Sequence, residues 1–207
     1  MLPRVVRRVT QGRVVTRLTI IALLAGASCL AQGASAPIVD SRVVTYPVYG
    51  ETVEEIKRSI ADNAPSRNGN SYYAGLTKWN LAATYDLIPT HQGCLLDNAE
   101  VYLTLRIHLP VLAQKPRSAA LEREWRRFFN SLNAHEALHG QNAHRAATTL
   151  LAKISGKRTD VPCSRAKLIA EQATQTLIER ISAYDKDLDA RTHHGATQGA
   201  ILNPSVQ

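Results

Sequence analysis

The feature that most constrains the fold is a stripe of large side chains in the second half of the chain. After Ser118 these residues recur at intervals of four and three positions, as Leu121, Trp125, Phe128, Leu132, His135 and His139. Because an α-helix turns once in about 3.6 residues, this spacing places them on one side of a long helix. The Ala- and Leu-rich residues 143–154 continue that helix, and Gly156 ends it. A second long helix is predicted from Ser164, a good N-cap, to about Ala190.

The first half of the chain has a different period. Apolar and polar residues alternate over Val101–Leu109 and again over Trp79–Leu87, which is typical of strands with one buried face. An earlier strand is predicted over Arg42–Tyr49, and a short helix that starts with a capping box over Thr52–Asp62. The segment Pro89–Asn98, which joins the two alternating strands, is long for a hairpin turn.

Strands in the first half and helices in the second half indicate an α+β fold. We expect a small antiparallel sheet followed by two long helices, with the histidine pair on the first of them. A length of 207 residues fits one globular domain with an additional segment. The predicted domain spans residues 35–207, and the additional segment is residues 1–34.

This N-terminal segment has the layout of a signal peptide. It begins with five arginines, Arg4, Arg7, Arg8, Arg13 and Arg17. An uncharged apolar run, Leu18–Leu30, follows, and small residues come after it. The run is short for a membrane span, which needs about 20 residues, so we expect cleavage after Ala31 or Ala34 and no stable span afterwards. A lipoprotein signal with Cys29 as the acylated residue, or a twin-arginine signal, is the alternative.

Removal of this segment changes the interpretation of the charge. The formal net charge of the whole chain is +8, and loss of the five arginines lowers it to +3. So small a charge argues against a nucleic-acid partner. The location predicted from the signal peptide is secreted or periplasmic.

The cysteines agree with export. Cys29 leaves with the signal peptide, so Cys94 and Cys163 remain in a compartment where disulfide bonds persist. We expect these two to pair, and the alternative is two separate buried thiols. No C-x-x-C motif is present, so a zinc site made of cysteines is not expected.

The residues with catalytic potential lie at the end of the helical stripe, in the sequence His135-Glu136-Ala-Leu-His139. Residues four apart lie about 40° from each other around a helix, so both imidazoles can bind one zinc ion. Glu136 lies about 100° further round, where it can act as the general base for a zinc-activated water. The alternative is a pair of ordinary helix histidines. Their place on an apolar stripe argues against it, because buried imidazoles need polar partners.

A catalytic zinc ion needs a third protein ligand. His144 is close in sequence, but on a continuous helix it faces away from both members of the pair. The remaining candidates are Glu171 on the second long helix, and His193 and His194 after that helix. Spacing alone leaves the choice among these residues open.

Several motifs together resemble a bacterial family catalogued as domain of unknown function 922, described as predicted secreted zinc-dependent proteases. The matching features, which extend over about Tyr46 to Ala200, are the signal segment, Thr77-Lys-Trp79, Tyr102-Leu-Thr-Leu105, His135-Glu136-x-x-His139 and Asp189-x-x-Thr192-x-His194-Gly195-x-x-Gln198-Gly199. The resemblance implies zinc binding, peptide hydrolysis and a zincin-like fold. It also implies that His194 is the third ligand.

The resulting hypothesis is an exported zinc metallopeptidase that acts on a peptide or protein substrate. The substrate would add as a strand to an exposed sheet edge, such as one bearing Arg106 and His108. Tyr184 or Tyr102 could stabilise the oxyanion, but the favoured interpretation is that both are ordinary half-buried tyrosines. One alternative is a non-catalytic envelope protein in which zinc is structural. Another is hydrolysis of a non-peptide amide, such as a cell-wall crosslink, by the same residues.

Overall fold

A long antiparallel hairpin of β4 (Leu76–Thr90) and β5 (Gly93–Leu112) forms the centre of the sheet in this computed structural model, which describes residues 36–68 and 71–206. The alternation predicted for these strands is confirmed, because Val101, Leu103 and Leu105 are buried while their neighbours are more exposed. The segment expected to be a long connection is instead paired almost to its end. Thr90 lies opposite Gly93, so the turn is tight. Buried and more exposed residues continue to alternate in this segment, where Cys94 and Leu96 are buried. The two strands are therefore longer than predicted.

The sheet is mixed rather than wholly antiparallel. Its order is β1-β5-β4, where β1 (Ile38–Val48) runs parallel to β5, and β6 (Lys157–Thr159) pairs antiparallel with β5. The expectation of a purely antiparallel sheet is therefore wrong for β1. In the sheet, β5 lies between β1 and β4, and these two outer strands run in opposite directions. Along the chain, β1 is followed by α1 (Val53–Asn63) and then by β4 before β5 begins.

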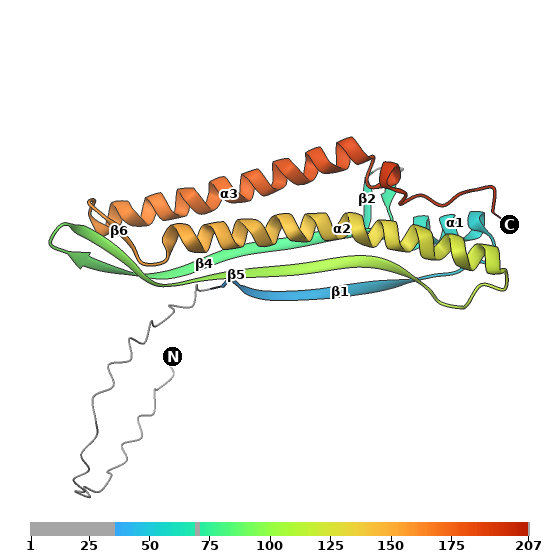
Figure 1. The fold of residues 1–207 in the computed structure, drawn as a ribbon, viewed down its shortest axis with the longest axis horizontal. Coiled ribbons are helices and arrows are strands. Elements are labelled where there is room, and N and C mark those ends of the chain that lie inside the picture. Colours follow the sequence, from blue (N-terminus) through green and yellow to red (C-terminus); the bar gives the residue numbers. More distant parts are fainter. Residues whose placement is uncertain (1–35, 69–70, 207) are drawn as a thin grey trace, which may run out of the picture. The chain divides into compact units, whose positions relative to one another are not determined.

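Two long helices follow the sheet, which confirms the predicted fold class. They are α2 (Ala119–Ile154) and α3 (Cys163–Thr192). Ser118 caps α2 by accepting a hydrogen bond from the backbone N–H of Leu121. Within the described unit, α2 packs against β4 and β5, and α3 packs against α2 and β4 (Figure 1). A 3₁₀ turn, η1 (Ala196–Gln198), follows α3, and a short antiparallel pair, β2 (Ser66–Asn68) and β3 (Ser71–Tyr73), precedes β4.

The apolar core has two parts along α2. One part packs the second half of α2, residues 143–154, against the hairpin and α3. The other packs the first half, residues 121–132, against α1 and the buried Leu202 of the tail. His135, Glu136 and His139 lie between these two parts, so a polar segment of α2 is placed inside the protein.

The predicted signal peptide, residues 1–34, lies outside the described residues. Within the described ranges, no helix is long and apolar enough to cross a membrane. The predicted disulfide is confirmed, because Cys94 on β5 is bonded to Cys163 at the start of α3, with a sequence separation of 69. It joins the turn end of the hairpin to the helix that packs on it.

We expect replacement of both Cys94 and Cys163 by serine to lower the free energy of unfolding by about 4 kcal/mol, because the bond restricts a long loop of the unfolded chain. Urea unfolding of the two chains without reductant measures the difference. Adding a reductant should bring the parent close to the variant and leave the variant unchanged. Equal stability of the two oxidised chains would contradict a stabilising role for the bond.

Candidate metal centre

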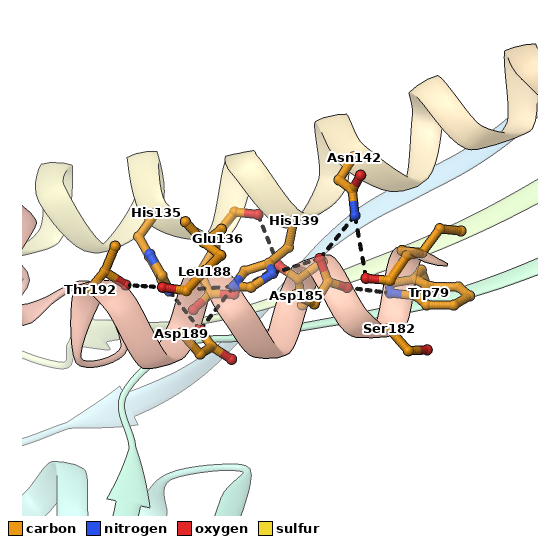
Figure 2. Close-up of polar contacts among 12 residues, drawn as sticks. Trp79, His135, Glu136, His139, Asn142, Ser182, Asp185, Leu188, Asp189 and Thr192 are labelled. Atoms are coloured by element: carbon orange, nitrogen blue, oxygen red, sulfur yellow. Dashed lines mark hydrogen bonds and ion pairs between the residues drawn. The ribbon is translucent and has the colours of Figure 1, made fainter. Parts of the chain in front are cut away.

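The two histidines of the sequence motif are buried and point from α2 toward α3. His135 is 2% exposed and His139 is 6% exposed. Their rings are 4.9 Å apart between centroids and nearly perpendicular. Figure 2 shows both rings directed at the carboxylates of α3. The inward orientation predicted from the apolar stripe is thus confirmed.

A carboxylate of α3 completes the group. Asp189 Oδ1 lies 3.1 Å from His135 Nε2 and 3.1 Å from His139 Nε2, and the two Nε2 atoms are 3.3 Å apart. These three residues form a group whose ligand atoms all lie within 4.8 Å of one another. The corners of a tetrahedral zinc site with bonds of 2.0–2.1 Å are about 3.3 Å apart, so the three atoms fit three of its corners.

The opposite nitrogen of each ring faces an oxygen. His135 Nδ1 lies 2.9 Å from Gln198 Oε1, and His139 Nδ1 lies 3.0 Å from Asp185 Oδ1. An amide or carboxylate oxygen accepts a hydrogen bond, so a proton on each Nδ1 would satisfy these two contacts and leave the lone pair of each Nε2 for a metal ion. Asp185 in turn accepts hydrogen bonds from Trp79 Nε1 at 2.9 Å and from Asn142 Nδ2 at 3.2 Å (Figure 2).

With that protonation, three electron-rich atoms meet at one point, between two buried histidines and a half-buried aspartate. This arrangement is unfavourable unless a proton or a metal ion lies among them. Burial lowers the pKa of His139, but hydrogen bonds to Asp185 and Asp189 outweigh it and raise the pKa to about 10. Burial raises the pKa of Asp189, and the two imidazoles outweigh it and hold that pKa well below its usual value. The group stabilises positive charge.

Glu136 lies beside this group and is only 4% exposed. Burial raises the pKa of its carboxyl group. Thr77 Oγ1 donates a hydrogen bond to Glu136 Oε2 at 2.8 Å. The other oxygen, Oε1, faces Gly75, where a Cβ atom would lie only 2.4 Å away. Glycine at this position leaves room for the carboxylate.

An open cleft of about 520 Å³ contains the group and Glu136. Its walls come from α1, the segment before β4, α2, the end of α3 and the tail. The apolar part of the lining includes Ile60, Phe128, Leu132 and Leu202. The two histidines, although buried, thus line a cleft that is only partly enclosed by protein.

The other candidate ligands lie apart from the pair. His144 is exposed on α2, and Glu171 is exposed and paired with Lys167. His193 and His194 line the cleft. His194 is 45% exposed, its Nδ1 lies 3.5 Å from Asp189 Oδ1, and its ring packs on that of Tyr73. It is next to the group of three but not within it, and its role as a ligand stays a prediction.

The expected peptide-binding edge is wrong, and the two candidate tyrosines lie outside the cleft. The strand that bears Arg106 and His108 is not a sheet edge, because β5 is paired with β1 on one side and with β4 on the other. Tyr102 and Tyr184 are not in the lining of the cleft. Tyr102 is instead on the outer face of the sheet, where its hydroxyl group donates to Glu100.

Sequence reasoning missed Asp189 as a donor and Asp185 as a partner of His139. One signal was available, since the two aspartates are four residues apart on the predicted second helix and therefore lie on one side of it. Gln198 was noted only as part of a motif. The structure shows that it fixes the orientation of the His135 ring.

The tail after α3 is held against α2 by two charged residues. Arg127 donates to Glu124 at 2.9 and 2.6 Å, and also to the carbonyl oxygens of Gly199, at 2.7 Å, and Ile201. Glu124, which is buried, accepts from the backbone N–H of Asn203 at 2.6 Å. These bonds place η1 so that Gln198 reaches His135.

The fold and the site define an α+β protein with a candidate metal centre between two long helices. The chain belongs to the family described as bacterial protein of unknown function, DUF922, whose profile matches residues 43–195. The family resemblance drawn from the motifs is therefore confirmed. No curated protein and no solved structure matches the chain.

We expect Gly195→Ala to weaken zinc binding by at least about tenfold, because a Cβ atom there would lie 2.9 Å from His135 Cγ and displace the ring. Isothermal titration with zinc measures the affinity. Gly156→Ala is the matched control, since Gly156 also has a positive φ, of 62° against 82°, but no atom within 4 Å of the added Cβ. Equal zinc affinities of the two variants would contradict the expected displacement of the His135 ring by a side chain at position 195.

Proposed function

We propose that this protein is an exported zinc-dependent metallopeptidase in which His135, His139 and Asp189 bind zinc and Glu136 is the general base. One observation carries the proposal. Three lone-pair donors converge at tetrahedral spacing in a cleft that also contains a buried glutamate. Imidazole and carboxylate are ligands that zinc prefers, and a set of three is usual for catalytic zinc sites. Membership of the family, whose function is unknown, agrees with this proposal without testing it.

Asp185 and Gln198 support the proposed site because each contacts the Nδ1 atom of one histidine ring. Histidine ligands of zinc commonly donate their other N–H to a carboxylate or carbonyl oxygen, which fixes the ring and increases its basicity. Both imidazoles have such a partner, within 3.0 Å. The site is thus organised to bind a metal ion before the ion arrives.

When bound, zinc lowers the pKa of a water ligand to about 7 and polarises the carbonyl group under attack. The chain's own contribution is proton transfer by Glu136. Its buried carboxyl group has a raised pKa, which favours a residue that accepts a proton and later donates it to the leaving amine. Thr77 donates a hydrogen bond to one carboxylate oxygen, so we assign the proton transfer to the other. Apolar side chains, among them Phe128 and Leu132, line the same cleft as this carboxylate.

We assign substrate binding to the start of β4. Residues 74–77 line the cleft, and β4 has a strand partner on one side only among the described residues. An extended peptide can add to such an edge through backbone hydrogen bonds. This places the peptide beside Glu136, since Thr77 is hydrogen-bonded to that residue.

A structural role for zinc is the second candidate, favoured by the origin of the ligands on two helices. His135 and His139 lie on α2 and Asp189 lies on α3, so a bound ion would also tie these helices together. Removal of zinc would lower the melting temperature under either function. The two functions differ in whether Glu136 is needed for activity.

The Cys94–Cys163 bond supports export as part of the proposal, because disulfide bonds persist mainly outside the cytoplasm. The signal peptide that would direct export remains an expectation from the sequence. Mass spectrometry of the N-terminus of the protein recovered from its host would test it.

We expect Glu136→Gln to lower peptide cleavage by about 10²- to 10⁴-fold, because the amide cannot accept the proton. Zinc content and melting temperature should stay close to those of the parent. Cleavage of a mixed peptide library, read by mass spectrometry, measures activity without assuming a specificity. His144→Gln, on the exposed side of the same helix, is the control and should keep full activity. Equal cleavage by Glu136→Gln and the parent would overturn the role of Glu136.

We expect Asp189→Asn to weaken zinc binding by at least about 100-fold, because it removes the charge that faces both Nε2 atoms. His194→Gln should weaken it by less than about tenfold, since this side chain lies outside the group of three. Competition with a zinc chelator measures both affinities. The opposite order would identify His194 as the third ligand, as the family resemblance implies, and would leave Asp189 as a partner of the imidazoles.

A further inference from the structure

One edge of β1 has no strand partner among the described residues. Among the described residues, β1 pairs only with β5, so its other edge presents unpaired backbone N–H and C=O groups. It forms the margin of the sheet, on the side away from α3 (Figure 1). An edge strand of this length is normally protected, because it offers a template for another strand.

The first part of β1 is exposed on both of its faces. Residues 38–45 are all exposed, although four of them are large and apolar, namely Ile38, Val39, Val43 and Val44. Val43 is 58% exposed and Ile38 is 49% exposed. Pro47 and the buried Val48 come only at the end of the strand. Apolar side chains on both faces of a free edge indicate association rather than protection.

The sequence around Ser41 is complementary to itself when it is read in the opposite direction. In an antiparallel pair centred on Ser41, Asp40 lies opposite Arg42 of the second copy, and Arg42 lies opposite Asp40. The same register places Val39 opposite Val43, and Ile38 opposite Val44. Every apolar residue thus meets an apolar residue and every charge meets its opposite, which are the pairs that stabilise adjacent strands.

We propose that β1 pairs antiparallel with β1 of a second copy of this chain, centred on Ser41, and joins the two sheets in a symmetric dimer. A two-fold axis through Ser41 makes both halves of the contact equivalent. The inference is independent of the proposed metallopeptidase activity.

The charges of β1 are available for this contact. Arg42 donates to Asp40 at 3.2 Å within the same strand, but its side chain is largely exposed, and such a surface pair contributes little to stability. Arg106 of β5 holds the other oxygen of Asp40 at 2.6 Å. Asp40 can therefore keep Arg106 and exchange its own Arg42 for that of the second copy.

Disulfide trapping tests the register. Ser41→Cys places two thiols face to face on the axis, at the Cα separation of about 4.5 to 5.5 Å found between paired antiparallel residues, which a disulfide can span. We expect an oxidised covalent dimer in non-reducing electrophoresis, reversed by reductant. Thr45→Cys, on the same face but away from the axis, and the parent chain are the controls and should stay monomeric in this assay. Equal crosslinking of the two cysteine variants would overturn the proposed register.

Charge exchange tests the interface without a crosslink. Sedimentation of the purified chain at rising concentration should show a dimer, and Arg42→Asp should raise its dissociation constant by about tenfold or more, because it sets like charges opposite each other twice. The double variant Asp40→Arg with Arg42→Asp restores opposite charges and should regain most of the affinity. A monomer at concentrations up to about 1 mM would overturn the proposal. Failure of the double variant to recover, with an unchanged melting temperature, would do the same.

Discussion

The contact of one carboxylate with two imidazoles determines the arrangement of the second half of this protein. Asp189 reaches across from α3 to both histidines of α2, and each distance is 3.1 Å. Burying the two imidazoles beside a half-buried carboxylate is unfavourable unless their polar atoms have partners. The oxygen atoms of Asp185 and Gln198 supply these partners on the far side of the rings. The relative position of α2 and α3 is consequently fixed by polar geometry as well as by apolar packing.

The sheet provides the rigid support for this contact. α2 crosses the β4–β5 hairpin with apolar core on either side of the histidine pair, so the helix is held at both ends of its polar segment. β4 contributes Thr77 to Glu136 and Trp79 to Asp185. One strand therefore orients both the candidate base and the second partner of His139. Thr77 and Trp79 face the helices because they alternate with Lys78 and Asn80, which are exposed on the outer face of the strand.

Local periodicity was enough to predict the strands, the long helices and the histidine pair. Alternation over Val101–Leu109 and the three-four stripe over α2 depend only on neighbours in the chain. The parallel pairing of β1 with β5 was not predictable in this way. It depends on the position of β5 between β1 and β4 in the sheet, and that position is not set by neighbours in the chain. The donor role of Asp189 was missed for a similar reason. Asp189 can contact His135 only because its turn of α3 lies beside that residue. The alignment of α3 along α2 is set by packing between residues that are far apart in the sequence, as these two are.

The ending of the chain shows how one short segment can satisfy several of these requirements together. Asp189 lies in the last turns of α3, and Thr192 closes the helix by accepting from the N–H of Gly195 at 3.1 Å. His193 and His194 adopt left-handed conformations, so the chain reverses at once. Gly195 can then lie against the ring of His135, where a side chain would collide with it. Three residues later Gln198 reaches the Nδ1 atom of the same ring. The helix thus places a carboxylate at one nitrogen of His135, and the reversal after it brings an amide to the other, which a straight helix could not do.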